Sequence, residues 1–101
     1  MLPTKRMATH PGEVLQEEFI TPMGITQAGL ARHIGVHAFV INEIVHAKRG
    51  VTPRMAVMLA RALGTSPEFW LGLQADYDLS KVLRTNEGKR VQAIRPIART
   101  G

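Results

Sequence analysis

The sequence predicts an all-α fold of five short helices in one domain. Apolar residues recur at helical spacing in five segments, and residues that start and stop helices bound each segment. No segment alternates polar and apolar residues between hairpin turns, as a strand would. A chain of 101 residues, 45% hydrophobic and 21% charged, suits a single globular domain.

The first helix is expected over residues 11 to 20. Pro11 suits a first helical turn, because the N–H group that it lacks would have no partner there. The segment from Thr21 to Gly24 contains a proline and a glycine and ends the helix. Residues 1 to 9 show no periodicity and are expected to form a mobile arm.

Two further helices follow, joined by a short turn. Thr26 is a natural N-cap for a helix over residues 27 to 34, because its hydroxyl can accept an unpaired backbone N–H. Gly35 can adopt the left-handed conformation that ends this helix. The third helix should cover about residues 38 to 47, and the basic loop Lys48-Arg49-Gly50 should end it.

The fourth and fifth helices begin with one type of signal. Thr52-Pro53 and Ser66-Pro67 each place a capping residue before a proline at the first helical position. Gly64 should end the fourth helix, and the fifth is expected to reach Leu83. The helical domain is therefore expected to span residues 10 to 83.

Residues 84 to 101 are expected to form a basic C-terminal tail. Their apolar content falls, and Pro96 would interrupt a helix. We expect this tail to stay flexible until a partner binds it.

The formal charge of +5 is concentrated in the middle of the chain and in the tail. This suits a polyanion partner or a merely solvated surface, and charge alone does not choose between them. The absence of cysteine excludes disulfides and thiolate metal sites. No apolar run approaches the roughly 20 residues of a membrane span, and the N-terminus lacks a signal peptide's apolar stretch. A cytoplasmic protein without membrane contact is expected.

Residues 26 to 46 carry the clearest functional signal. Ala31 is small where the second helix passes the third, and Gly35 permits the tight turn between them. Ile41 and Ile44 fill the angle between the two helices. This spacing is typical of a helix-turn-helix, whose second helix enters the major groove of DNA. An ordinary helical hairpin without nucleic acid is the alternative.

Six motifs extend this signal along the chain: His10-Pro11-Gly12-Glu13-Val14-Leu15, Gly24-Ile25-Thr26-Gln27, Ile41-Asn42-Glu43-Ile44-Val45, Lys48-Arg49-Gly50-Val51-Thr52, residues 61 to 71, and residues 73 to 79. With these motifs the chain resembles, over roughly seven tenths of its length, the HigA-type antitoxins. This group, also called virulence-associated protein I, lies in the XRE-like helix-turn-helix superfamily. The resemblance implies a lambda-repressor-like DNA-binding domain.

The resemblance also implies a homodimeric antitoxin that represses its own operon and neutralises a HigB-like toxin that cleaves messenger RNA. The family usually opens its third helix with serine and further polar residues. This chain instead has His37-Ala38-Phe39-Val40. Ala38 and Phe39 cannot form a bidentate hydrogen bond with a base edge, although they can contact a thymine methyl group.

Double-stranded operator DNA is the expected nucleic-acid partner, with eight predicted contact residues: Gln27, Arg32, His37, Ala38, Phe39, Asn42, Lys48 and Arg49. Gln27 opens the second helix, where it can bind a phosphate. Asn42 is the best candidate for adenine recognition. Lys48 and Arg49 should bind flanking phosphates, with Arg32 as a further candidate. Solvated surface is the alternative for each basic residue.

One short reading helix indicates a dimer, because useful specificity normally requires two half-sites held by a two-fold axis. The fifth helix carries more apolar residues than one face needs, and Leu79, Val82 and Leu83 are expected to contact the second copy. The acidic first helix, with Glu13 and Glu17, offers a complementary surface to a basic toxin.

No catalytic site is expected. His33 and His37 are four residues apart, but Gly35 breaks the helix between them and the glutamate of zinc-protease spacing is missing. Ser66 and Ser80 lack a recognisable His–Asp setting. We therefore expect no metal and no cofactor. The alternative to a DNA-binding antitoxin is a protein-interaction module, toxin-binding or scaffold, without sequence-specific DNA contacts.

Overall fold

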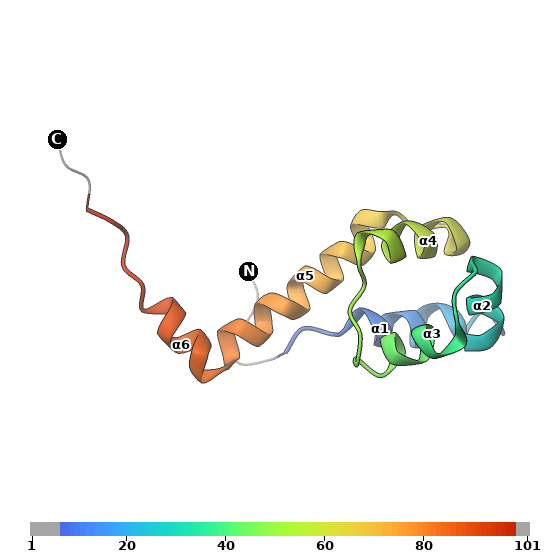
Figure 1. Ribbon diagram of the computed structural model, residues 1–101, viewed down its shortest axis with the longest axis horizontal. Helices are drawn as coiled ribbons and strands as arrows, with labels where there is room; N and C mark the ends of the chain where they lie inside the picture. The colour runs from blue at the N-terminus through green and yellow to red at the C-terminus, as the bar shows by residue number, and fades with distance from the viewer. Residues whose placement is uncertain (1–6, 99–101) are drawn as a thin grey trace.

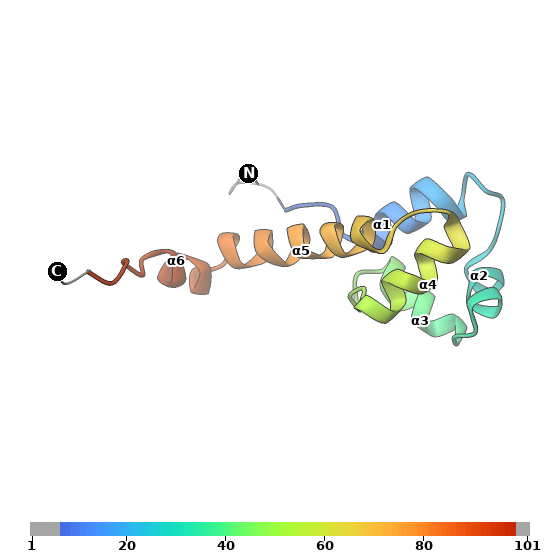
Figure 2. The ribbon, with the colours of Figure 1, turned by 90° about the horizontal axis from the view of Figure 1, so that it is seen from above.

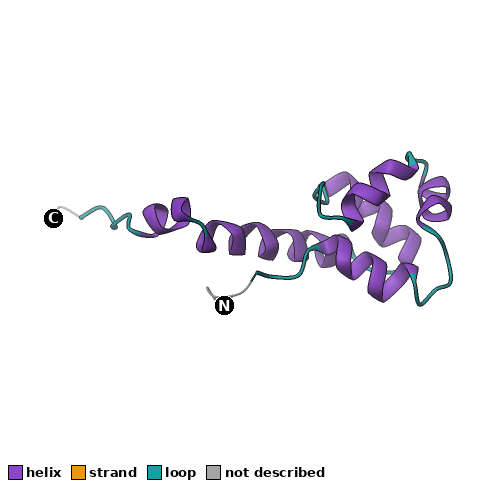
Figure 3. Ribbon diagram, turned by 90° about the horizontal axis from the view of Figure 1, so that it is seen from below, coloured by secondary structure: helices purple, strands orange, loops and turns teal. Residues whose placement is uncertain are grey.

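The computed structural model describes residues 7–98, and all regular structure in that range is helical (Figures 1 and 3). The predicted all-α class is confirmed. The elements are α1 (Pro11–Val14), the π-helix η1 (Leu15–Ile20), α2 (Gln27–Ile34), α3 (Ala38–Val45), α4 (Pro53–Leu63), α5 (Pro67–Arg84) and α6 (Asn86–Gln92). Elements α1 to α4 form a compact head with the start of α5, and the rest of α5 extends from this head toward α6 (Figures 1 and 2).

The expected capping residues and glycines are found at the ends of α2, α4 and α5. Thr26, Thr52 and Ser66 are N-caps whose hydroxyl oxygens accept the backbone N–H three residues later, at 2.9, 3.2 and 3.1 Å. Gly35 and Gly64 end α2 and α4 in the left-handed conformation, with φ of +81° and +74°. Local side-chain chemistry therefore sets these boundaries.

The predicted first helix is present over residues 11 to 20, but its second part is π-helical. The backbone N–H of Thr21 donates to the carbonyl of Gln16, five residues earlier, at 3.0 Å. This i→i+5 bonding brings residues five apart onto one face, unlike the α-helix. Apolar periodicity over so short a segment does not distinguish the two forms.

The core lies between η1, α2, α3, α4 and the start of α5. Its largest fully buried hydrophobic side chains are those of Trp70, Leu15, Ile41, Ile44 and Leu59. The Trp70 ring packs 5.4 Å from that of Phe19, and its indole N–H donates to Thr65 Oγ1 at 2.7 Å. Burial of each such side chain stabilises the fold by about 1.5–3 kcal/mol.

A backbone contact between α1 and α3 sets how deeply α3 is seated. Gly12 is buried, and a Cβ atom there would overlap the carbonyl oxygen of Ile44. Only glycine lets the two backbones approach this closely. With Ile41 and Ile44 buried on the same side, the opposite side of α3 faces solvent.

The segment before α1 is attached to α5. The backbone N–H of Ala8 donates to Oγ of the buried Ser80 at 3.1 Å. His10 is the N-cap of α1: its Nδ1 accepts the N–H of Gly12 at 2.9 Å, and its ring packs edge-on against Tyr77. The expectation of a mobile arm is therefore wrong at residue 8, whereas residues 1 to 6 lie outside the described residues.

The expected flexible tail contains a sixth helix, α6. Thr85 is its N-cap and accepts the N–H of Gly88 at 3.0 Å. Gly88 is buried against the end of α5, where a Cβ atom would overlap the carbonyl oxygen of Val82. The expectation of a flexible tail is wrong over Asn86–Gln92, because a local cap and a close backbone contact compensate for weak apolar periodicity.

Gly12→Ala should lower the free energy of unfolding by about 3 kcal/mol, because the added methyl group forces α1 away from α3. Urea unfolding measures the change. The matched control is Gly72→Ala in α5, where a Cβ atom would meet nothing within 4 Å. The free energy of unfolding of that variant should rise by up to about 1 kcal/mol, because alanine has a higher helix propensity than glycine. Equal stability of the two variants would contradict the proposed backbone contact.

Acidification should destabilise the protein through His10. Burial lowers the pKa of His10 below its ordinary value of 6.5; the Asp78 carboxylate opposes the shift, and Lys81 adds to it. The folded state therefore binds this proton less readily than the unfolded chain. The free energy of unfolding should consequently fall as the pH drops through 6.5. Protonation also removes the Nδ1 acceptor that caps α1.

The measurement compares urea unfolding of the wild type and His10→Asn at about pH 7.5 and about pH 5. Asparagine keeps an N-capping side chain but does not titrate in this range. The wild type should lose more stability than the variant between the two conditions. Identical losses would show that His10 does not carry the effect.

Candidate nucleic-acid interface

The outer side of α3 is exposed along its length. Ile41 and Ile44 point into the core, whereas Ala38, Phe39 and Asn42 are exposed. Phe39 is 57% exposed, a large value for an aromatic side chain in a domain with a well-packed core. The second helix of the motif therefore has an accessible face, which insertion into a groove requires.

Four polar side chains connect η1, α2 and α3. Asn42 Nδ2 donates to Gln27 Oε1 at 3.1 Å, and Gln27 Nε2 donates to Gln16 Oε1 at 2.9 Å. Gln16 Nε2 donates in turn to Thr21 Oγ1 at 2.9 Å. We call these four residues the amide relay. The fold thus brings together two of the predicted contact residues, Gln27 and Asn42.

A layered group of side chains lies at the start of α3. His37 is the N-cap residue, but its ring makes no capping hydrogen bond and stacks on Phe39, with centroids 5.5 Å apart. The Arg49 guanidinium lies 5.9 Å from the centroid of the Phe39 ring, within cation–π range. Three more of the predicted contact residues are therefore neighbours: His37, Phe39 and Arg49.

Arg49 also forms an ion pair with Glu43 of α3. Its Nε and Nη2 donate to Glu43 Oε1 at 3.0 and 2.7 Å. Both side chains are partly exposed, at 44% and 38%. The ion pair and the cation–π contact together place the basic loop beside the exposed side of α3.

The two other predicted phosphate contacts are less constrained. Arg32 on α2 and Lys48 after α3 are exposed, and neither side chain forms a hydrogen bond or ion pair with the part of the chain that the structure describes. Long cationic side chains in this setting can turn toward a phosphate without first breaking a contact.

Two residues of this face, Gln16 and Glu43, are not among the predicted contact residues. Gln16 was not found because its contacts depend on the π-helical turn, which leaves no distinct pattern in the sequence. Glu43 could have been found, since it is the one acidic residue among the basic residues of the middle segment. Its partner lies six residues away across a loop, so helical spacing gave no indication of the pair.

The predicted partner-contact residues lie on the part of α5 that extends from the head (Figure 1). Leu79 and Val82 are 51% and 43% exposed, whereas Leu83 is half-buried. Beyond them, Val91 and Ile94 are exposed as well. The end of the molecule opposite α2 thus carries apolar surface outside the core.

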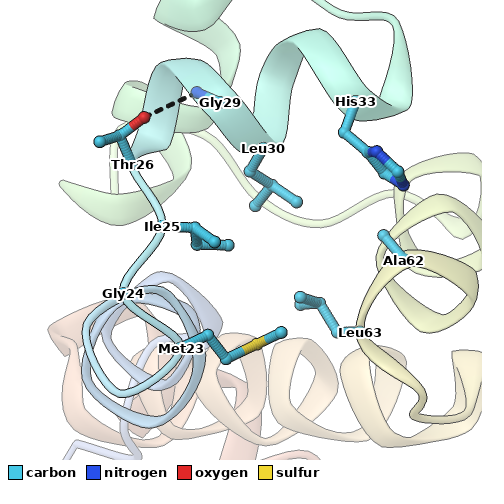
Figure 4. A pocket seen from close by; sticks show the side chains of 9 residues that line it. All are labelled: Met23, Gly24, Ile25, Thr26, Gly29, Leu30, His33, Ala62 and Leu63. Atoms are coloured by element: carbon cyan, nitrogen blue, oxygen red, sulfur yellow. Dashed lines mark hydrogen bonds between the residues drawn. The ribbon is translucent and has the colours of Figure 1, made fainter.

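A pocket of about 470 Å³ lies between the loop after η1, α2 and the end of α4 (Figure 4). Its lining is mainly apolar and includes Met23, Ile25, Leu30 and Leu63, and His33 is its one titratable lining residue.

Among residues 7–98, no cluster of three or more His, Cys, Asp or Glu side chains could hold a metal ion. None of the helices described here has the length and apolar character that a bilayer span needs.

Comparison with known proteins agrees with this geometry. The model of the helix-turn-helix family matches residues 16–70. Antitoxin HigA-1 of Vibrio cholerae serotype O1 is 45% identical over 80 residues, which cover 78% of this chain and 74% of the relative.

Two solved structures extend the similarity to nearly the whole chain. The antitoxin GraA superposes with a TM-score of 0.84 at 37% identity, covering 91% of this chain and 99% of GraA. The Pseudomonas aeruginosa antitoxin HigA, solved with the higBA promoter, superposes with a TM-score of 0.82 at 37% identity, covering 90% and 99%. The chain therefore belongs to the helix-turn-helix family, among its HigA-type antitoxins.

Proposed function

We propose that this protein is the antitoxin and autorepressor of a type II toxin–antitoxin operon. It binds operator DNA as a dimer through α3 and neutralises a HigB-like toxin that cleaves messenger RNA. The observation that carries the DNA-binding part is the exposed side of α3, where Asn42, Phe39 and the basic loop lie together. The relative solved with its promoter supports the same use of the fold. Because operator DNA and a toxin that cleaves messenger RNA are partners inside the cell, we also propose a cytoplasmic location.

Base recognition is assigned to Asn42, Phe39, Ala38 and His37. Asn42 offers a bidentate hydrogen bond to adenine, and Phe39 and Ala38 offer apolar contact to a thymine methyl group. Because His37 stacks on Phe39, the two rings enter the groove as one unit. We therefore expect an operator half-site in which A·T pairs dominate the contacts with α3.

Phosphate contacts are assigned to Lys48, Arg49, Arg32 and Gln27. Lys48 and Arg32 are exposed cations, and Gln27 stands at the first position of α2, where the positive helix end favours an anion. Arg49 must exchange Glu43 for a phosphate or contact both. These contacts should supply most of the affinity and make it strongly dependent on salt.

Dimerisation is assigned to the exposed side of α5, with Leu79 and Val82 at its centre and the half-buried Leu83 at its edge. A two-fold dimer would present two copies of α3 to half-sites about one DNA turn apart. Toxin binding is assigned to the exposed carboxylates of α1 and η1, among them Glu13 and Glu17, which complement a basic ribonuclease.

One observation favours the second candidate, a protein-interaction module without sequence-specific contacts. The first turn of α3 offers Ala38, Phe39 and Val40 in place of polar side chains. A gel-shift titration at matched salt compares the DNA upstream of the gene with random DNA. A preference of about 10³ or more supports the repressor, and equal affinities support the interaction module.

Lys48→Ala/Arg49→Ala should weaken binding to both DNAs alike, because phosphate contacts carry no sequence information. The slope of log affinity against log salt should become less steep by about 2, because two phosphate contacts are lost.

Asn42→Ala should instead weaken binding to the operator by about 1–3 kcal/mol and relax the preference at one base pair. Gel shifts on a set of singly substituted operators separate the two patterns. If Asn42→Ala keeps the full wild-type preference, Asn42 does not read a base.

Val82→Glu should convert the dimer to a monomer, since burial of an unpaired carboxylate at an apolar interface is strongly unfavourable. Light scattering over a range of concentrations gives the molar mass. Val57→Glu on α4 is the matched control, because Val57 is 46% exposed and Val82 43%, and it should leave the dimer intact. A dimer that survives Val82→Glu places the interface elsewhere.

A further inference from the structure

We propose that Gln16 is a positioning residue for base recognition, acting on Asn42 through Gln27. The inference rests on the proposed function and deepens it, because it explains how the reading side chain is oriented before DNA arrives. Gln16 lies on η1, outside the two helices of the motif. Its effect on recognition is therefore indirect and passes through two hydrogen bonds.

The middle of the amide relay is more buried than its two ends. Gln16 and Gln27 are partly buried, whereas Asn42 and Thr21 are exposed. The contacts of 2.9 Å at Gln16 and 3.1 Å at Asn42 are within ordinary hydrogen-bond distance. Because the inner residues are more shielded from water, their orientation is better defined than that of an isolated surface asparagine.

The polarity of the relay decides what Asn42 presents to DNA. Each amide nitrogen donates to the next residue of the relay, and the last acceptor is the Thr21 hydroxyl. Asn42 therefore uses one N–H and keeps its other N–H and its carbonyl oxygen for a ligand. Adenine offers N6–H as a donor and N7 as an acceptor in the major groove, which matches these two groups.

If the hydrogen bond between Gln27 and Asn42 ran in the opposite direction, Asn42 would offer different groups to the base. If the Gln27 amide turned over, its nitrogen would face Asn42, which would then have to accept with its carbonyl oxygen. Asn42 would be left with its oxygen partly occupied, a poor match for adenine. Gln16 opposes a reversal of Gln27 alone, because the Gln27 carbonyl oxygen would then face Gln16 Oε1 with no proton between the two acceptors.

The π-helical turn places Gln16 for this role. Gln16 and Thr21 are five residues apart, and in an α-helix they would point in directions well separated around the axis. The i→i+5 bond from the Thr21 N–H to the Gln16 carbonyl brings them to one face, so that their side chains also bond. This contact holds the end of the relay that lies opposite Asn42.

The test measures the ratio of affinities for operator and random DNA at matched salt. Gln16→Ala should lower this ratio about 3- to 10-fold, the effect of one net hydrogen bond, and leave the affinity for random DNA unchanged. Gln16→Glu keeps the acceptor for Gln27 and should retain most of the ratio. Because the role passes through Asn42, Gln16→Ala/Asn42→Ala should lower the ratio no further than Asn42→Ala alone.

A second readout needs no DNA. In two-dimensional NMR spectra of the free protein, Gln16→Ala should shift the side-chain amide signals of Gln27 and Asn42, whereas Gln16→Glu should move them less. A wild type without operator preference overturns the proposed function. An operator preference that Gln16→Ala leaves intact, or effects that add fully in the double variant, overturns the positioning role alone. The positioning role is also overturned if Gln16→Glu lowers the ratio of affinities as much as Gln16→Ala does.

Discussion

The seating of α3 against α1 is the constraint on which the rest of the structure depends. At Gly12 the two backbones approach so closely that no side chain fits between them, and Ile41 and Ile44 fill the core on the same side. Packed interiors resist small displacements, because lost contacts and overlaps both cost free energy. α3 therefore has a defined depth and rotation, which decides which of its residues can reach a base.

Given that seating, side chains from three other segments organise the outer face of α3. The amide relay reaches Asn42 from η1 and α2, and the basic loop reaches Phe39 through Arg49. The N-terminal end of α3 has no side-chain cap, since His37 stacks on Phe39. The order of this face therefore comes from contacts with the rest of the head, more than from the helix itself.

The sequence was informative wherever local chemistry decides the structure. Thr26 caps α2 and Gly35 ends it as their neighbours in the sequence indicate, because a cap or a left-handed turn needs only a few adjacent residues. Non-local contacts were harder to foresee. The role of Gln16 depends on a π-helical turn, and α6 depends on how closely Gly88 approaches the end of α5. Such contacts leave no periodic signal.

In the proposed complex with DNA, the Glu43–Arg49 ion pair would reconcile the apolar face of α3 with the need for phosphate contacts. Both partners are partly exposed, and exposed ion pairs contribute only about 0–1 kcal/mol. Exchange of the carboxylate for a phosphate therefore costs little, while the pair and the cation–π contact hold the guanidinium near Phe39 beforehand. In the proposed complex, a cation held beside the ring would let Arg49 contact the DNA backbone as Phe39 enters the groove. In the proposed complex, α3 would then gain a phosphate contact beside its apolar residues without a polar first turn.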